Sequence, residues 1–204
     1  MLAPENLAAR SAVLAVALAL MIGCGAPVEE PAPEPFDPSQ REFIGHLADL
    51  CGQIFPGATE LVADETLPPA DAKLAMTVKE CSEKQVRIAF HVNQDTWSRT
   101  WVVTLKEEGL LLKHDHRNQD GTPQERTNYG GWATEGGLPT LQVFPADDET
   151  RELVPEAATN IWTLELNKEK QTFSYILTRF GEPRFRAVFD LTQGQPIEPA
   201  GDGA

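Results

Sequence analysis

The sequence predicts a mainly β fold: an antiparallel meander of about eight strands, as a small barrel or a sandwich, with one N-terminal amphipathic helix. Two observations predict it. Between residues 73 and 191, apolar and polar residues alternate with the strand period of two, and turn sequences separate the alternating segments. Strands joined by such short turns pair antiparallel with their neighbours. Sequential hairpins dominate, which favours the barrel over the sandwich.

Chain length and charge limit the classes of function. The chain has 204 residues and a formal net charge of −14, from 31 acidic against 17 basic residues. We expect a single β-rich domain at 37–195 and a flexible tail at 196–204, because about 150 residues bury one substantial core. An acidic chain is repelled by the phosphates of nucleic acids, so we expect no nucleic acid partner.

Residues 1–23 have the pattern of a secretory signal. Arg10 precedes an apolar run at 11–22, which is shorter than the roughly 20 residues that span a bilayer. The run ends in Met21-Ile22-Gly23-Cys24, which resembles the lipobox of bacterial lipoprotein precursors. The alternative is an ordinary cleaved signal with an unrelated cysteine after it.

The resemblance implies that Cys24 becomes the first mature residue and carries a diacylglycerol thioether and a further acyl chain such as palmitate. Two or three acyl chains give a stable membrane anchor. The implied location is the bacterial cell envelope, with the domain outside the cytoplasm. Gly25 is not the aspartate that retains such proteins in the inner membrane of enteric bacteria, which favours the outer membrane. The Pro/Glu-rich segment 24–36 predicts an extended tether, and we expect no membrane contact apart from the anchor.

An amphipathic helix of about four turns is predicted after the tether. Pro38 suits a first helical turn, and Ser39 with Glu42 has capping-box spacing. Apolar residues then recur at helical spacing as far as Ile54, and Pro56-Gly57 would end the helix.

Cys51 and Cys81 remain once Cys24 is lipidated. In an oxidising compartment such a pair predicts a disulfide. Closing a loop of about 30 residues stabilises by roughly 3–4 kcal/mol. Two free thiols or a thiolate metal site are the alternatives, and the zinc signal is weak because the two cysteines lie thirty residues apart with no histidine at a zinc-motif spacing.

The strands follow in order along the chain. The clearest is a hairpin, with strands at 99–106 and 110–117 around the turn at Glu107-Glu108-Gly109. The other predicted strands lie at 73–80, 86–92, 138–144, 162–166, 173–177 and 185–191. A weak helix is predicted at 148–158. Arg179, Arg184 and Arg186 flank one turn, and ordinary charge at strand edges explains them better than the alternative, an anion-binding site.

The hairpin leads into the His-x-His of the sequence. At a period of two, His114 and His116 share one strand face with Leu110 and Leu112, and Asp115 faces the other way. Two imidazoles on one face can ligate a single metal ion, but catalytic zinc needs a third ligand that the sequence does not reveal. The alternative is that both histidines mark the polar end of the strand and bond nearby carbonyls or acids.

The segment Thr127 to Thr140 is predicted to be a Gly-rich loop with two aromatic residues, Tyr129 and Trp132. Irregular loops of this length are often functional, and these rings would stack on a ligand. The alternative is a barrel-end loop held in place by its own aromatics. No Gly-Lys-Ser/Thr follows the glycines, so the loop is not a phosphate cradle.

The sequence favours a non-catalytic, lipid-anchored binding protein for a small apolar ligand or another envelope protein. We identify no catalytic residue and expect no cofactor. One alternative is a metal-dependent protein or enzyme using the His114/His116 end, and another is a passive role in assembly. The segment from LCGQIF to AVFDLT resembles small secreted bacterial proteins of no assigned function, which implies no mechanism.

Overall fold

The computed structural model describes residues 37–197. The predicted signal, Cys24, the tether and most of the predicted tail lie outside the described residues. The helices are α1 (Pro38–Ala48), α2 (Asp148–Leu153) and the short 3-10 turns η1 (Pro155–Ala157) and η2 (Leu191–Gln193). The strands are β1 (Gln53–Val62), β2 (Leu74–Lys79), β3 (Gln85–Val92), β4 (Arg99–Lys106), β5 (Gly109–His116), β6 (Tyr129–Trp132), β7 (Leu141–Pro145), β8 (Asn160–Asn167), β9 (Thr172–Arg179), β10 (Glu182–Asp190) and β11 (Gln195–Pro196).

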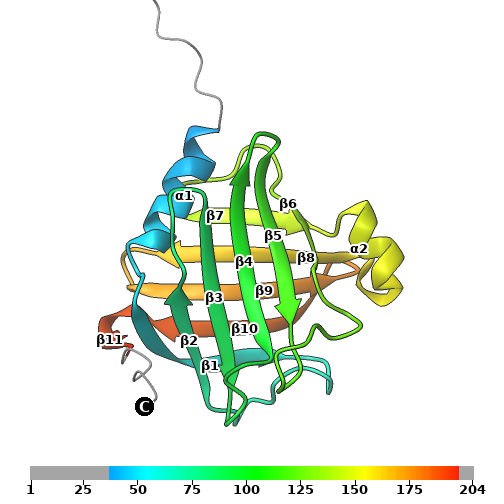
Figure 1. Ribbon diagram of the computed structural model, residues 1–204, viewed down its shortest axis with the longest axis horizontal. Helices are drawn as coiled ribbons and strands as arrows, with labels where there is room; N and C mark the ends of the chain where they lie inside the picture. The colour runs from blue at the N-terminus through cyan, green and yellow to red at the C-terminus, as the bar shows by residue number, and fades with distance from the viewer. Residues whose placement is uncertain (1–36, 198–204) are drawn as a thin grey trace, which may run out of the picture. The chain divides into compact units, whose positions relative to one another are not determined.

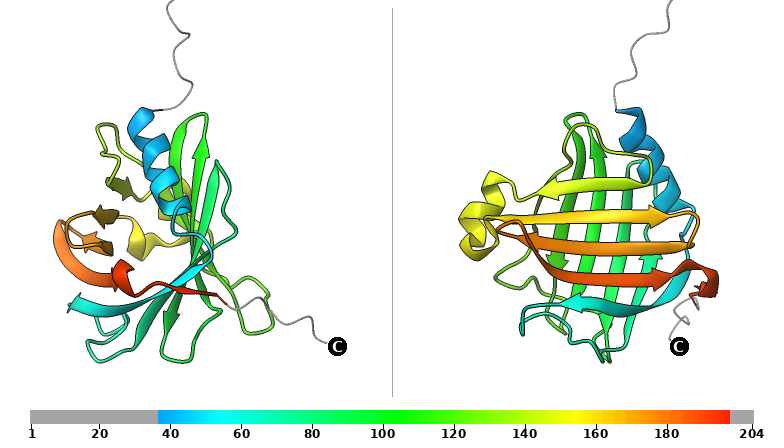
Figure 2. Two further views of the ribbon diagram at one scale, coloured as in Figure 1. Left: turned by 90° about the vertical axis from the view of Figure 1, so that its left-hand side faces the viewer. Right: turned by 180° about the vertical axis from the view of Figure 1, so that it is seen from behind.

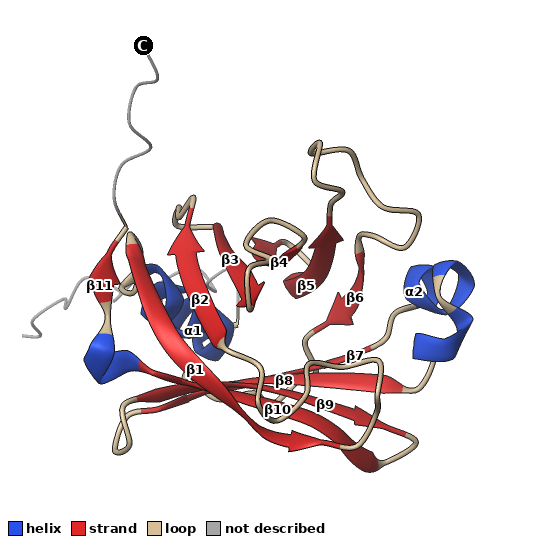
Figure 3. Cartoon of the chain, turned by 90° about the horizontal axis from the view of Figure 1, so that it is seen from below, coloured by secondary structure: helices blue, strands red, loops and turns tan. Residues whose placement is uncertain are grey.

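The fold is an antiparallel meander that forms a nearly closed barrel, which confirms the predicted class and favoured architecture. The strand order is β6-β5-β4-β3-β2-β1-β10-β9-β8-β7, and β11 adds a short pair to β1. In Figure 1, β2–β5 run in front of β7–β10 and cross them. Figure 3 views the barrel from below, where β2–β6 arch over β7–β10. The prediction of about eight strands missed β1, β6 and the short β11.

The N-terminal helix is real but shorter than predicted. It ends at Ala48 rather than near Ile54, and Ile54 belongs to strand β1 at residues 53–62. Gly52 has φ +78°, a conformation that suits glycine and ends the turn after α1. Asp37 rather than Ser39 caps the helix, because the Asp37 carboxylate accepts the Ser39 backbone N–H at 2.8 Å. The predicted capping box is therefore wrong by two residues.

Strand β1 was missed because Ile54 fits the spacing of the preceding helix and Pro56-Gly57 is a helix-ending signal. It pairs with β2 on one side, and with β11 and then β10 on the other. Pro56 lies between the segments paired with β11 and β10, where β1 has no neighbour on that second side. A proline is tolerated in a strand where its missing N–H is not needed. Pairing over long range, rather than local periodicity, decides the structure here.

Strand β6 occupies the first part of the predicted Gly-rich loop, so that part of the prediction is wrong. A Cβ on Gly130 would lie 1.9 Å from the Leu112 carbonyl oxygen, and one on Gly131 would lie 1.7 Å from the Pro145 carbonyl oxygen. Only glycines let β6 fit this closely between β5 and the end of β7. The Asp147 N–H donates to the Gly130 carbonyl at 3.0 Å, which brings the two ends of the sheet together.

Helix α1 fills one end of the barrel. Phe43, Ile44 and Leu47 point into the core and are at most 2% exposed. Figure 2 shows α1 lying between the two crossed groups of strands at this end. The buried Gln40 side chain accepts the Leu110 N–H at 2.8 Å, which fixes α1 to the start of β5.

A disulfide joins Cys51, in the turn after α1, to Cys81, just after β2, with a Cα–Cα distance of 6.2 Å. The predicted pairing is confirmed. It attaches the segment that follows the helix to the first β hairpin. No helix within residues 37–197 is long and apolar enough to cross a membrane.

Candidate functional site

A cavity of about 540 Å³ lies at the opposite end of β4 and β5 from α1. Alternate residues of neighbouring strands face the barrel interior, so the strand ends at this side contribute inward side chains to one space. Its ring-bearing lining residues are Phe90, Trp101, Tyr129, Trp162, Tyr175, Phe185 and the histidines 114 and 116. Its other polar lining residues are Thr66, Arg99, Gln124, Arg126, Glu156, Asn160 and Arg179.

Aromatic rings make up two walls of the cavity. On one side, Trp101 stacks on Tyr175 with ring centroids 4.4 Å apart and planes 5° apart, and Phe90 stacks on the far face of this pair at 4.8 Å. On the other, His114 stacks on Tyr129 at 4.8 Å, and Trp162 lies 4.9 Å from His114. Stacked rings of this kind give flat, rigid surfaces of low conformational freedom.

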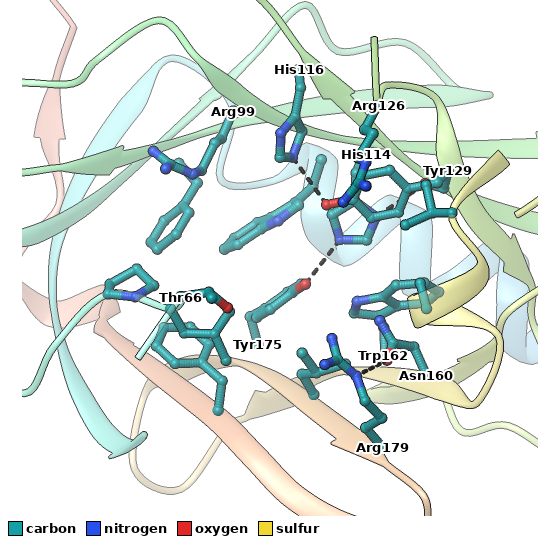
Figure 4. A pocket seen from close by; sticks show the side chains of 18 of the residues that line it. Thr66, Arg99, His114, His116, Arg126, Tyr129, Asn160, Trp162, Tyr175 and Arg179 are labelled. Carbon is teal, nitrogen blue, oxygen red and sulfur yellow. Dashed lines mark hydrogen bonds between the residues drawn. The ribbon is translucent and has the colours of Figure 1, made fainter. Parts of the chain in front are cut away.

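His114 sits at the centre of a buried hydrogen-bond chain (Figure 4). Its Nδ1 lies 3.1 Å from the Tyr129 carbonyl oxygen, and its Nε2 lies 2.9 Å from the Tyr175 hydroxyl. A carbonyl oxygen only accepts, so Nδ1 carries the proton and donates to it. The neutral ring then has a bare Nε2, which accepts the Tyr175 O–H. One tautomer is therefore fixed by the backbone.

Burial keeps this chain neutral. It lowers the pKa of His114 from 6.5 to about 3, and the neighbouring His116 charge acts in the same direction. Burial also raises the pKa of Tyr175 well above its ordinary value. At physiological pH neither group carries charge, so His114 orients Tyr175 and does not act as a cation.

His116 and Tyr129 form a second polar contact nearer the mouth. The Tyr129 hydroxyl lies 3.2 Å from His116 Nε2. The pKa of His116 is lowered, first by burial and then by the positive charge of Arg99. Burial raises the pKa of Tyr129 to about 12, although Arg99 and Arg179 act in the opposite direction.

Three arginines line the mouth, and each is held by an acid. Arg99 Nη1 donates to the Asp95 carboxylate at 2.8 Å. Arg126 pairs with Glu156 across the mouth. Arg179 Nε donates to Asn160 Oδ1 at 2.8 Å. Arg179 Nη1 also lies 3.5 Å from an Asp64 carboxylate oxygen. These contacts fix the guanidinium groups at the edge of an otherwise aromatic space.

The His-x-His prediction is confirmed in orientation. His114 and His116 face the interior, whereas Asp115 is on the outer face and pairs with Arg87 and Arg117. Metal binding by the two histidines stays a prediction, but both ring nitrogens of His114 are already hydrogen-bonded. Within residues 37–197, no three His, Cys, Asp or Glu side chains gather in a group that would hold a metal ion.

The two aromatic residues of the predicted Gly-rich loop lie in different surroundings. Tyr129 lines the cavity, but Trp132 does not, and Lys106 Nζ lies over its ring at 5.8 Å from the centroid. The loop therefore supplies one ring to the site, through strand β6 rather than through a flexible lid.

Several site residues escaped the sequence analysis. Trp101, Trp162 and Tyr175 were recognised as members of alternating strands but not as parts of one site, because they come from three separate strands. Arg179 lines the cavity, whereas Arg184 and Arg186, which flank the same turn, do not. The signal available in the sequence was a run of large rings on inward strand positions, which also describes an ordinary core.

The chain matches no model of a known protein family and no curated protein sequence. The cavity must therefore be interpreted from its own geometry. It offers flat apolar walls, a fixed neutral hydrogen-bond chain and cationic groups at the mouth. This combination is typical of a site that holds a small molecule.

Proposed function

We propose that this protein is a lipid-anchored bacterial envelope protein that binds a small organic molecule in the barrel cavity and catalyses no reaction on it. The observation that carries the proposal is the cavity of about 540 Å³ with stacked aromatic walls. Ligand pockets of this size are mostly apolar, with a few placed polar groups. The rings favour a ligand with a flat apolar body.

The non-catalytic part of the proposal rests on the polar groups of the cavity. A general base needs a free nitrogen or carboxylate within reach of a substrate proton. His114 uses both nitrogens internally, and Glu156 is paired with Arg126. Asn160 is paired with Arg179. At His114, Glu156 and Asn160 these contacts favour positioning over chemistry, and the Nε2 atom of His116 is within hydrogen-bond distance of the Tyr129 hydroxyl.

The anchor rests on the resemblance of Met21-Ile22-Gly23-Cys24 to a lipobox. The disulfide between Cys51 and Cys81 is consistent with an oxidising compartment outside the cytoplasm. We expect Cys24→Ser to move the protein from the membrane fraction to the soluble fraction of the envelope. Unchanged partitioning after detergent-free fractionation would contradict the anchor.

The binding function is tested with a matched pair of variants on the cavity lip. Ala157 lines the cavity and is buried, whereas the adjacent Ala158 does not line it. Ala157→Leu adds bulk to the cavity, and Ala158→Leu adds the same bulk beside it. Full-length protein is purified from membranes, extracted with organic solvent and analysed by mass spectrometry.

We expect a compound to co-purify near one-to-one with the wild type and with Ala158→Leu, and to be strongly depleted from Ala157→Leu. Thermal unfolding of each variant tests whether the fold is intact. Equal recovery of every bound compound from both variants would refute the cavity as the binding site. Absence of any enriched compound from the wild type would refute the proposal as well.

A further inference from the structure

The lining of the cavity differs in charge from the rest of the chain. Three arginines and one carboxylate line it, whereas the whole chain has 17 basic and 31 acidic residues. The carboxylates that brace two of the arginines, Asp64 and Asp95, do not line the cavity. Positive charge is therefore concentrated at the mouth of an aromatic space in an acidic protein.

Two of these arginines, Arg99 and Arg179, are held in place through only some of their guanidinium nitrogens. Arg99 comes from the start of β4, and its Nη1 donates to Asp95 at 2.8 Å and to Ser98 Oγ at 3.0 Å. Among the described residues, its Nε and Nη2 have no hydrogen-bond partner. These nitrogens form one edge of the guanidinium fork, which matches the two oxygens of a carboxylate.

Arg179 comes from the end of β9, on a different side of the cavity. Asn160, itself 5% exposed, accepts from Nε at 2.8 Å and sets the orientation of the group. The ion pair with Asp64 is long, at 3.5 Å, and Nη2 has no partner in the described part of the chain. Arg179 is thus placed by a neutral amide and is incompletely neutralised by an acid.

Both arginines face one region. Figure 4 shows Arg99 and Arg179 on different sides of the Tyr175 hydroxyl, with His116 between Arg99 and Tyr129. The Tyr175 proton is committed to His114, so its hydroxyl offers a ligand lone pairs rather than a donor. Donors for an anionic group therefore come from the arginines.

From this arrangement, and resting on the proposed function, we infer that the ligand is an organic anion. Its apolar body lies in the cavity beside Tyr129 and Tyr175, and its acidic group lies at the mouth between Arg99 and Arg179. A charge-assisted hydrogen bond is stronger than a neutral one, and more so where water is excluded. A neutral ligand of the same shape would bring no negative charge to the guanidinium nitrogens of Arg99 and Arg179 that their own acids leave unbonded.

The inference is tested with a matched pair of probes, 2-naphthoate and 2-naphthamide. The two have the same ring system and nearly the same shape, and they differ in charge. Each is titrated by calorimetry into the full-length protein in a non-ionic detergent, with a detergent blank subtracted. We expect 2-naphthoate to bind the wild type about tenfold more tightly or better, since hydrogen bonds to charged groups contribute this much.

Arg179→Gln and Arg99→Gln each remove one cationic group from the mouth. We expect each to reduce the naphthoate-to-naphthamide affinity ratio several-fold. Arg151→Gln is the control, because Arg151 lies on α2 outside the cavity and pairs with Asp148, and it removes the same charge. We expect Arg151→Gln to preserve the ratio. Thermal unfolding of all three variants distinguishes loss of binding from loss of the fold. If one of the two mouth variants does not fold, the other still provides the test.

Equal affinity for the two probes would overturn the anionic ligand while leaving a small-molecule site in place. An unchanged ratio in both mouth variants would also overturn it. If neither probe binds at millimolar concentration, the inference fails, and the Ala157→Leu and Ala158→Leu comparison decides separately whether the binding function fails too.

Discussion

At one end of the barrel, α1 presents Phe43, Ile44 and Leu47 to the interior, and the space between the strands is filled. At the other end, the same strands present rings and polar groups around a cavity of about 540 Å³. The diameter of a barrel grows with its number of strands, and a meander of ten leaves an interior that strand side chains alone do not fill. Helix α1, which is not part of the meander, closes one end by filling it.

The two ends also treat polar groups differently. At the closed end, Gln40 accepts the Leu110 N–H and completes the packing. At the open end, His114 and Tyr175 satisfy each other, and both line the cavity. The polar groups of these pairs are satisfied at both ends, but only the open end keeps a cavity for another molecule. A satisfied polar pair therefore has a purely structural role where the barrel is filled and can contribute to binding where a cavity remains.

The largest expected effect is at the closed end. Phe43→Ala removes a fully buried ring from the interface between α1 and the strands. We expect the free energy of unfolding to fall by about 3–5 kcal/mol, as for other buried aromatic truncations. Urea unfolding of the full chain measures it. A loss below about 1 kcal/mol would show that α1 does not hold this end of the barrel closed.

Removing the disulfide tests whether the closed end and the open end of the barrel are independent. It closes a 30-residue separation and ties the segment after α1 to the first hairpin. Cys51→Ser combined with Cys81→Ser should lower the free energy of unfolding by roughly 3–4 kcal/mol, mainly because the unfolded chain gains freedom. Denaturant unfolding of the variant and of the non-reduced wild type measures the difference. Because the cross-link lies away from the cavity, 2-naphthoate affinity should be retained; its loss would show that the two ends are coupled.

The open end should respond to acid through His114. Its pKa is about 3 in the folded protein and about 6.5 when unfolded, so the neutral ring contributes stability above pH 6.5. That contribution decreases as the pH falls from 6.5 toward 3, and at pH 5 about 2 kcal/mol has been lost. His116 and His91 also have lowered pKa values and add losses of the same sign.

The measurement is the free energy of unfolding of the wild type and His114→Gln between pH 7 and pH 5. We expect the wild type to lose about 2 kcal/mol more than the variant, because the variant lacks the titrating ring while the other groups remain. Parallel profiles would show that His114 is not held neutral by burial.

The smallest effect is expected for an exposed aromatic residue near the open end. Phe180 lies in the turn between β9 and β10 and is 72% exposed. Phe180→Ser should change the free energy of unfolding by no more than about 0.5 kcal/mol, in contrast to Phe43→Ala. Parallel urea curves provide the test. A loss comparable with that of Phe43→Ala would mean that the turn is covered in the folded protein.

The sequence determined the local features of this protein. Alternation in the hairpin of β4 and β5 placed His114 and His116 on one face and Asp115 on the other, because side chains alternate along any strand. The pair Cys51 and Cys81 predicted the disulfide because Cys24 was assigned to the lipobox and an oxidising compartment was expected. The antiparallel meander followed from short turns, which allow sequential strands few other arrangements.

Only the tertiary structure decided the closure of the barrel and the site. Residues 53–62 became β1 because β2 and β10 both pair with them, although Ile54 fits the spacing of the preceding helix and Pro56-Gly57 signals a helix end. Gly130 and Gly131 became part of β6 because neighbouring backbone leaves room for no side chain. Arg99, Tyr175 and Arg179 meet only when the meander curves into a barrel. Local periodicity encodes which way a side chain faces, whereas the residues it faces depend on contacts between distant strands.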